Sequence, residues 1–118
     1  MIQAAKQRNV KLVLLTPPPF DPQPFRKAGK LVKQDAGKFA WFSIYENYDN
    51  EVMKKYADFV LTQSKDVHEV IDLRQPIFNY LNSQREQDPD FAMSGDGVHL
   101  NHDGHALIAT TVLKAWGY

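Results

Sequence analysis

The sequence contains no cysteine, and this single absence excludes disulfides, thiolate metal sites and a cysteine nucleophile. It also has no excess of charge, because 14 Lys and Arg residues balance 14 Asp and Glu residues. Without a basic or acidic field, the composition predicts neither a nucleic acid nor an anionic membrane as a partner. Neither absence determines the cellular compartment.

Long hydrophobic runs are missing as well. The longest apolar stretch, Val10–Leu15, contains Lys11 and is far shorter than the roughly 20 residues that cross a bilayer. The first residues also lack the apolar core of a signal peptide. We therefore expect no membrane span, while a signal upstream of Met1 would leave secretion open.

What is present has the composition of a globular domain, because 43% of the 118 residues are hydrophobic. Residues 1–9 predict the end of a helix that terminates at Asn9. The apolar run Val10–Leu15 predicts a strand that is covered on both faces, and the prolines at 17–19 end its hydrogen-bond ladder.

A second strand is predicted at Val67–Leu73, after a helix that Asp49 or Asn50 caps and that continues through Val60. Strand, helix and strand in this order indicate a parallel pair. The predicted fold class is therefore α/β.

Two further helices complete the pattern. Pro76 suits the first position of a short helix. Asn101 suits the N-cap of a last helix, which Gly117 ends.

Residues 20–48 show an irregular pattern, and we expect little regular structure there. The aromatic residues Trp41, Phe42 and Tyr45 most simply pack this segment onto the body of the protein. The alternative is that they form a platform for an acyl group or a sugar.

The segment from Ser94 to His105 carries three of the four histidines and is the densest cluster of chemically active residues. Within it, Asp96 and His99 are close enough for the carboxylate to accept a hydrogen bond from Nδ1–H of the imidazole. Such a bond sets the tautomer and leaves Nε2 to take a proton from a hydroxyl nucleophile. Asp96 and His99 are therefore the candidate catalytic acid and base.

The same spacing has two other interpretations. Asp96 and His99 could belong to a turn in which the carboxylate accepts backbone N–H groups and the ring packs. Asp96 and the three histidines of the segment could instead bind zinc or iron, but side chains three residues apart converge poorly across a junction of loop and helix. We expect His102 and His105 to face solvent, and we predict neither a metal nor a cofactor.

The end of this loop, together with the apolar helix after it, forms a recognisable motif. It reads Asp96-Gly97-Val98-His99-Leu100-Asn101-x-x-Gly104-His105 and resembles the last conserved block of SGNH (GDSL-type) hydrolases. Upstream, Leu15–Pro19 resembles the strand and proline-rich turn after the third block of that family, and Val70–Leu73 resembles its last strand. The resemblance covers nearly the whole chain. It implies a three-layer α/β/α fold with a parallel, flavodoxin-like sheet, of which residues 1–118 are the C-terminal part of a single domain.

By this resemblance, His99 is the catalytic base and Asp96 is the acid that orients it, in an esterase that acts on acyl esters such as acetylated carbohydrates or lipids. The family's Gly-Asp-Ser block and the glycine and asparagine of its oxyanion hole are not found in this sequence. Ser94 stands in the wrong context for the nucleophile, and no other serine has a better one. We therefore expect the 118-residue chain alone to be inactive.

Two strands leave a sheet with open edges, so we expect a second copy of the chain or a missing N-terminal half to pair beside Val10–Leu15. The alternative function, from a different class, is a binding or assembly module that keeps the second half of the fold without a nucleophile. A Gly-Asp-Ser segment upstream of Met1 would favour the enzyme.

Overall fold

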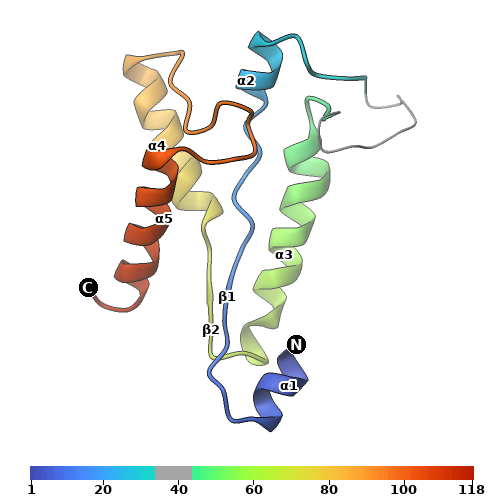
Figure 1. Cartoon of the computed structure of the whole chain (residues 1–118), viewed down its shortest axis with the longest axis vertical. Helices are drawn as coiled ribbons and strands as arrows, with labels where there is room; N and C mark the ends of the chain where they lie inside the picture. Colours follow the sequence, from blue (N-terminus) through green and yellow to red (C-terminus); the bar gives the residue numbers. More distant parts are fainter. Residues whose placement is uncertain (34–43) are drawn as a thin grey trace.

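The computed structural model describes residues 1–33 and 44–118 of the chain (Figure 1). Its helices and strands follow the chain in the order α1 (Ile2–Gln7), β1 (Val13–Leu15), α2 (Pro22–Lys27), the π-helical turn η1 (Asp49–Met53), α3 (Lys54–Thr62), the 3-10 turn η2 (Gln63–Lys65), β2 (Glu69–Ile71), α4 (Arg74–Gln87) and α5 (His102–Ala115). Helices combined with a parallel sheet make this an α/β fold, which is the predicted class.

β1 and β2 form a parallel two-stranded sheet, in a register that pairs Val13 with Glu69 and Leu15 with Ile71. Both predicted strands and their parallel orientation are confirmed, although each strand is shorter than expected. β1 starts late because the N–H of Val10 is still bonded to a carbonyl of α1, at 3.0 Å.

Thr16 joins the two strands at the end where both leave the sheet, and it is only 1% exposed. Its hydroxyl donates to the Asp72 carboxylate at 2.9 Å and accepts the N–H of Leu73 at 2.8 Å. The same carboxylate accepts the N–H of Arg74 at 3.0 Å. Helix α4 therefore begins at Arg74, earlier than predicted, and Pro76 lies in its first turn, where a missing N–H removes no intrahelical bond.

Three helices end in the same left-handed cap. The residues that follow α1, α2 and α5 in this position are Asn9, Gly29 and Gly117, with φ angles of 52°, 64° and 86°. In each case the next N–H donates back to a carbonyl in the last turn of the helix. Asn9 and Gly117 thus end their helices as predicted.

Helix α2 is a short regular element in the segment 20–48, where we expected little regular structure. The helix starts after Asp21, whose carboxylate accepts the N–H of Gln23 at 3.1 Å. Pro22 occupies the first helical position, where its fixed φ suits a helix. An N-cap, a proline and the glycine at 29 are local signals that together define this short helix.

The aromatic residues of the same segment are described in part. Tyr45 packs edge-on against Tyr48 of the same segment, with ring centroids 5.8 Å apart. Tyr45 also forms an isolated parallel bridge with Val32. Trp41 and Phe42 lie outside the described residues.

Neither Asp49 nor Asn50 caps the middle helix, contrary to the prediction. The Asp49 carboxylate instead accepts the N–H of Phe20 at 2.6 Å and forms an ion pair with Arg74. The two charged side chains are only 9% and 10% exposed. A buried guanidinium needs a charged partner, and this need outweighs a capping bond that water can replace.

The main core lies between β2 and the two C-terminal helices. It is formed by the buried side chains of Ile71, Leu73, Ile77, Leu81 and Met93. A second cluster unites Phe20, Phe25 and Ile44. In Figure 1, α4 and α5 lie on one side of the two strands and α3 lies on the other.

Helix α3 is less well covered than α4. Ala57 is its one buried residue, while Tyr56 and Phe59 are both 63% exposed. Within the part of the chain that the structure covers, no helix combines the length and apolar character needed to cross a bilayer.

Candidate active site

The loop between α4 and α5 carries Asp96 and His99. An antiparallel bridge between Ser94 and Leu100 closes its tip. Figure 1 shows this loop beside α2, at the end of the strands that lies away from α1. Because β1 and β2 both run toward this end, the loop lies at the carboxyl edge of the sheet, where α/β folds bind their ligands.

Asn101 fixes the downstream end of the loop. Its side-chain oxygen accepts the N–H groups of Asp103 at 3.1 Å and Gly104 at 3.2 Å. Asn101 is thus the N-cap of α5, as predicted.

Asp96 and His99 are in direct contact, which is the arrangement that their spacing predicts. Nδ1 of His99 lies 2.7 Å from Oδ2 of Asp96. Oδ1 of the same carboxylate accepts the backbone N–H of Val98 at 3.0 Å and that of His99 at 2.8 Å. The His99 side chain is 76% exposed, so the rest of the ring is open to a further partner.

The environment of Asp96 favours its charged form. Partial burial raises the pKa of the Asp96 carboxyl, but the hydrogen bonds from the His99 ring, from two backbone N–H groups and from the Ser94 hydroxyl outweigh burial. The pKa of Asp96 is therefore held well below its ordinary value. At neutral pH, the carboxylate is ionised and acts as a hydrogen-bond acceptor for the imidazole.

Ser94 is a partner of Asp96 that the sequence interpretation missed. It is 3% exposed, and its hydroxyl donates to Oδ1 of Asp96 at 3.0 Å. The signal was present, because Ser and Asp side chains two residues apart commonly bond to each other and to the backbone between them. Ser94 thus helps to hold the carboxylate in place.

Gly97 docks the tip of the loop onto the start of α2. Its carbonyl accepts the N–H of Asp21 at 3.1 Å. At its φ of 71°, an added Cβ would lie 2.2 Å from the Asp21 carbonyl oxygen, so only glycine fits. The Asp21 carboxylate in turn accepts a hydrogen bond from Nη2 of Arg85 at 2.7 Å, so the loop is also connected to α4. The local sequence around Gly97 does not predict these long-range contacts.

The histidines do not gather around a common centre. His102 and His105 are exposed in the first turn of α5, as predicted, and His68 is exposed just before β2. Among the described residues, no group of three or more His, Asp or Glu side chains could hold a metal ion. The alternative interpretation, in which Asp96 and the three histidines of its segment bind a metal, therefore finds no support in the geometry.

Val98 lines two cavities beside the loop. One, of about 390 Å³, has apolar walls that include Phe20 and Met53. The other, of about 360 Å³, includes Lys30 and Asp96 among its lining residues.

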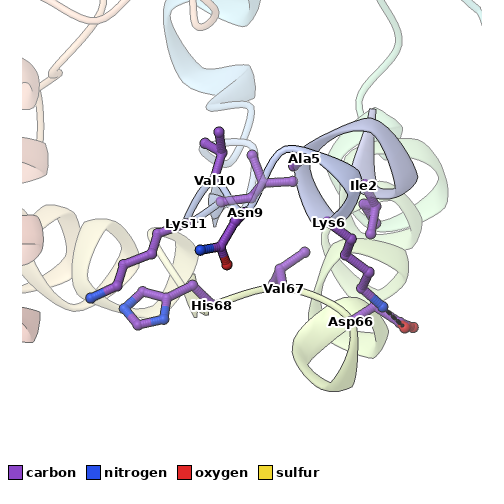
Figure 2. Close-up of a pocket in the computed structure, with 10 residues that line it drawn as sticks. Ile2, Ala5, Lys6, Asn9, Val10, Lys11, Asp66, Val67 and His68 are labelled. Atoms are coloured by element: carbon purple, nitrogen blue, oxygen red, sulfur yellow. Dashed lines mark hydrogen bonds and ion pairs between the residues drawn. The ribbon is translucent and has the colours of Figure 1, made fainter.

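A third cavity, of about 300 Å³, lies at the opposite end of the molecule, between α1 and the segment that precedes β2 (Figure 2). Its rim contains the ion pair of Lys6 and Asp66, with a distance of 2.7 Å. Lys11 and His68 also line this cavity (Figure 2).

The fold and the position of the loop at the carboxyl edge of the strands are those of an α/β protein. No protein-family model matches the sequence, and no curated protein matches it significantly. A solved structure of a gut microbial diltiazem-metabolizing enzyme is similar to 98% of this chain, with a TM-score of 0.68 and 19% sequence identity. The chain spans 25% of the length of that enzyme. At this identity, the similarity shows a shared fold alone.

Proposed function

We propose that this chain is the C-terminal part of an SGNH (GDSL-type) serine ester hydrolase with a three-layer α/β/α fold, and that it supplies the Asp and His of the catalytic triad. The observation that carries the proposal is the 2.7 Å contact between Oδ2 of Asp96 and Nδ1 of a largely exposed His99. The motif around these residues and the α/β similarity to a much longer enzyme support it.

In the proposed reaction, Nε2 of His99 takes the proton of a serine hydroxyl as the serine oxygen attacks the ester carbonyl. The ester C–O bond then breaks as His99 gives that proton to the departing alcohol oxygen, and an acyl-serine remains. In the second half, His99 takes a proton from water as the water oxygen attacks the acyl carbon; the bond to the serine oxygen breaks, His99 returns the proton to that oxygen, and the carboxylic acid leaves. Asp96 accepts the Nδ1–H bond throughout and stabilises the imidazolium, and no metal or cofactor takes part.

The nucleophile and the oxyanion hole would come from a part of the protein outside these 118 residues. The buried position of Ser94 and its bond to Asp96 suit a positioning role rather than that of a nucleophile. The same missing part, or a second copy of the chain, would pair with the outer edge of β1, where Leu15 is 42% exposed. The substrate would be an acyl ester, and acetylated carbohydrates and lipids both satisfy the chemistry.

The proposal is tested by comparing the 118-residue chain with a longer protein that includes it. We expect the chain alone not to hydrolyse p-nitrophenyl acetate, because it lacks the nucleophile. We expect the longer protein to hydrolyse this ester and to be labelled by a fluorophosphonate on a serine outside residues 1–118. His99→Ala should remove both the turnover and the labelling.

Two outcomes would contradict the proposal. Turnover by the pure 118-residue chain that is lost in His99→Ala would place the nucleophile among its own serines. A folded longer protein with neither turnover nor labelling would instead favour the non-catalytic binding module.

A further inference from the structure

The larger cavity beside Val98 has the size of a ligand site, and its walls are mainly apolar. Its volume is about 390 Å³, within the range of pockets that hold small molecules. Its main walls are Pro18, Phe20, Ile44, Tyr48, Met53 and Val98. Among the described residues that line it, none carries a charge, and the Tyr48 hydroxyl is the one polar side-chain group.

The walls of this cavity are held in place by buried contacts. Phe20 and Ile44 are each 3% exposed. The ring of Phe20 packs edge-on against those of Phe25 and Tyr48, with centroids 5.8 Å and 5.7 Å away. The buried carboxylate of Asp49 holds the N–H of Phe20 at 2.6 Å. A cavity with walls fixed in this way needs little reorganisation to bind a ligand.

The cavity adjoins the candidate active site through the loop that carries it. Gly97 and Val98, which line the cavity, are the two residues between Asp96 and His99. The neighbouring cavity on Val98 differs in chemistry, because it contains Lys30 and the Asp96 carboxylate. The loop that carries Asp96 and His99 is therefore bordered by one apolar and one polar cavity.

We propose that the apolar cavity receives the uncharged aromatic or branched alkyl group of the ester substrate, and that the substrate is an apolar ester rather than an acetylated carbohydrate. The inference rests on the proposed function of Asp96 and His99 as triad members. Sugar hydroxyls lose their hydration on burial and need hydrogen-bond partners, whereas the described wall side chains are apolar apart from the ring hydroxyl of Tyr48. Carbon-rich groups lose nothing by contact with such walls.

Binding can be measured on the 118-residue chain without any turnover. The first probe is propiophenone, which carries an aromatic ring and a carbonyl that cannot be hydrolysed. The second is methyl N-acetyl-β-glucosaminide, an acetylated sugar of similar reach. We expect propiophenone to shift the amide resonances of Gly97, Val98 and Ile44, and we expect the glucosaminide to leave them unchanged at the same concentration.

Two variants and a matched control locate the site. Val98→Asp places a carboxylate on the cavity wall, and Met53→Gln makes the wall polar with little change in shape. Each should weaken propiophenone binding by about tenfold or more. Val10→Asp is the control, because Val10 is another exposed valine on a cavity, at the opposite end of the molecule (Figure 2). This control should bind propiophenone like the unchanged chain.

The inference is overturned if propiophenone shifts resonances elsewhere, if it binds Val98→Asp and Met53→Gln unchanged, or if the glucosaminide binds in its place. The inference is also overturned if propiophenone does not bind, for example because another segment of the protein fills the cavity. In the longer protein, His99→Ala should abolish hydrolysis and retain propiophenone binding. Hydrolysis that survives His99→Ala contradicts the proposed function, whereas lost cavity binding with an intact triad contradicts only this inference.

Discussion

The two ends of the molecule carry cavities of similar size and very different surroundings. At the α1 end, the cavity of about 300 Å³ is edged by an exposed ion pair, Lys6 with Asp66, whose side chains are each 55% exposed. At the loop end, the Asp96 carboxylate accepts four hydrogen bonds. They come from the Ser94 hydroxyl, the backbone N–H of Val98, and the backbone N–H and ring Nδ1 of His99. The cavity volumes at the two ends are similar, so they do not indicate which end is functional. Polar groups held in place by several hydrogen bonds distinguish the loop end from the α1 end. The loop end is therefore the candidate active site.

The largest effect should come from replacing one histidine at each end. In the longer protein, we expect His99→Ala to lower kcat by about 10⁴-fold or more, because the proton has no other acceptor. His68→Ala, at the rim of the opposite cavity, should leave kcat unchanged. Equal losses in the two variants, or full activity in His99→Ala, would erase the functional difference between the ends.

The same assay separates the triad from a metal site. His102→Ala and His105→Ala should retain activity, and EDTA should have no effect, because neither side chain contacts Asp96 in the described structure. Losses in these variants equal to that of His99→Ala, together with inhibition by EDTA, would assign the site to a metal instead.

The next largest effect concerns the ion pairs of the two ends. Arg74→Met leaves the Asp49 carboxylate buried without its charged partner, so we expect a loss of about 3–5 kcal/mol in the free energy of unfolding. Lys6→Met breaks the exposed pair with Asp66 and should cost about 0–1 kcal/mol. Urea denaturation of both variants measures the difference. A loss in Arg74→Met no greater than that in Lys6→Met would contradict the role assigned to the buried pair.

The parts of the structure that the sequence predicts correctly are those that local chemistry determines. The capping of α5 by Asn101, the left-handed Gly117 that follows the helix and the contact of Asp96 with His99 all depend on neighbours within a few residues. Local chemistry is sufficient for such features, and they were predicted. The strand β1 was predicted for the same reason, since prolines follow an apolar run.

Features that depend on distant partners were not predicted. Asp49 looks like a helix cap in sequence, but its carboxylate bonds to Phe20 and Arg74, which only the folded chain brings near. Gly97 gives no sign in sequence that Asp21 lies against it. Packing decides these contacts, and hydrophobic patterns do not specify which polar groups packing will bury together.

A smaller effect is expected from two glycines within the loop. Gly97→Ala forces a Cβ toward the Asp21 carbonyl at a positive φ, so we expect a loss of about 1–3 kcal/mol in stability. In Gly95→Ala, the added Cβ meets nothing within 4 Å, and we expect a change within about 0.5 kcal/mol. Thermal unfolding of the pair measures this, and equal melting temperatures would show that the docking of the loop on α2 contributes nothing.

The smallest effect is the pH dependence of stability at Asp96. Because the pKa of Asp96 is lowered in the folded protein, its stabilising contribution is complete above the ordinary carboxyl pKa of about 4 and is lost as the pH falls below it. Asp96→Asn should therefore be less stable than the unchanged chain at pH 7, and the gap should close toward pH ~2. A gap at Asp96 that is constant with pH would contradict the hydrogen-bond account.

The most direct measurement of the central claim is the tautomer of His99, read from the ring ¹⁵N chemical shifts of the 118-residue chain with the imidazole neutral. The hydrogen bond from Nδ1 to Asp96 should make the Nδ1–H form predominate, which leaves Nε2 as the free base that a serine hydroxyl requires. In Asp96→Asn, this preference should disappear. A predominant Nε2–H form in the unchanged chain, or the same tautomer ratio in both proteins, would contradict the assignment of Asp96 and His99 as acid and base.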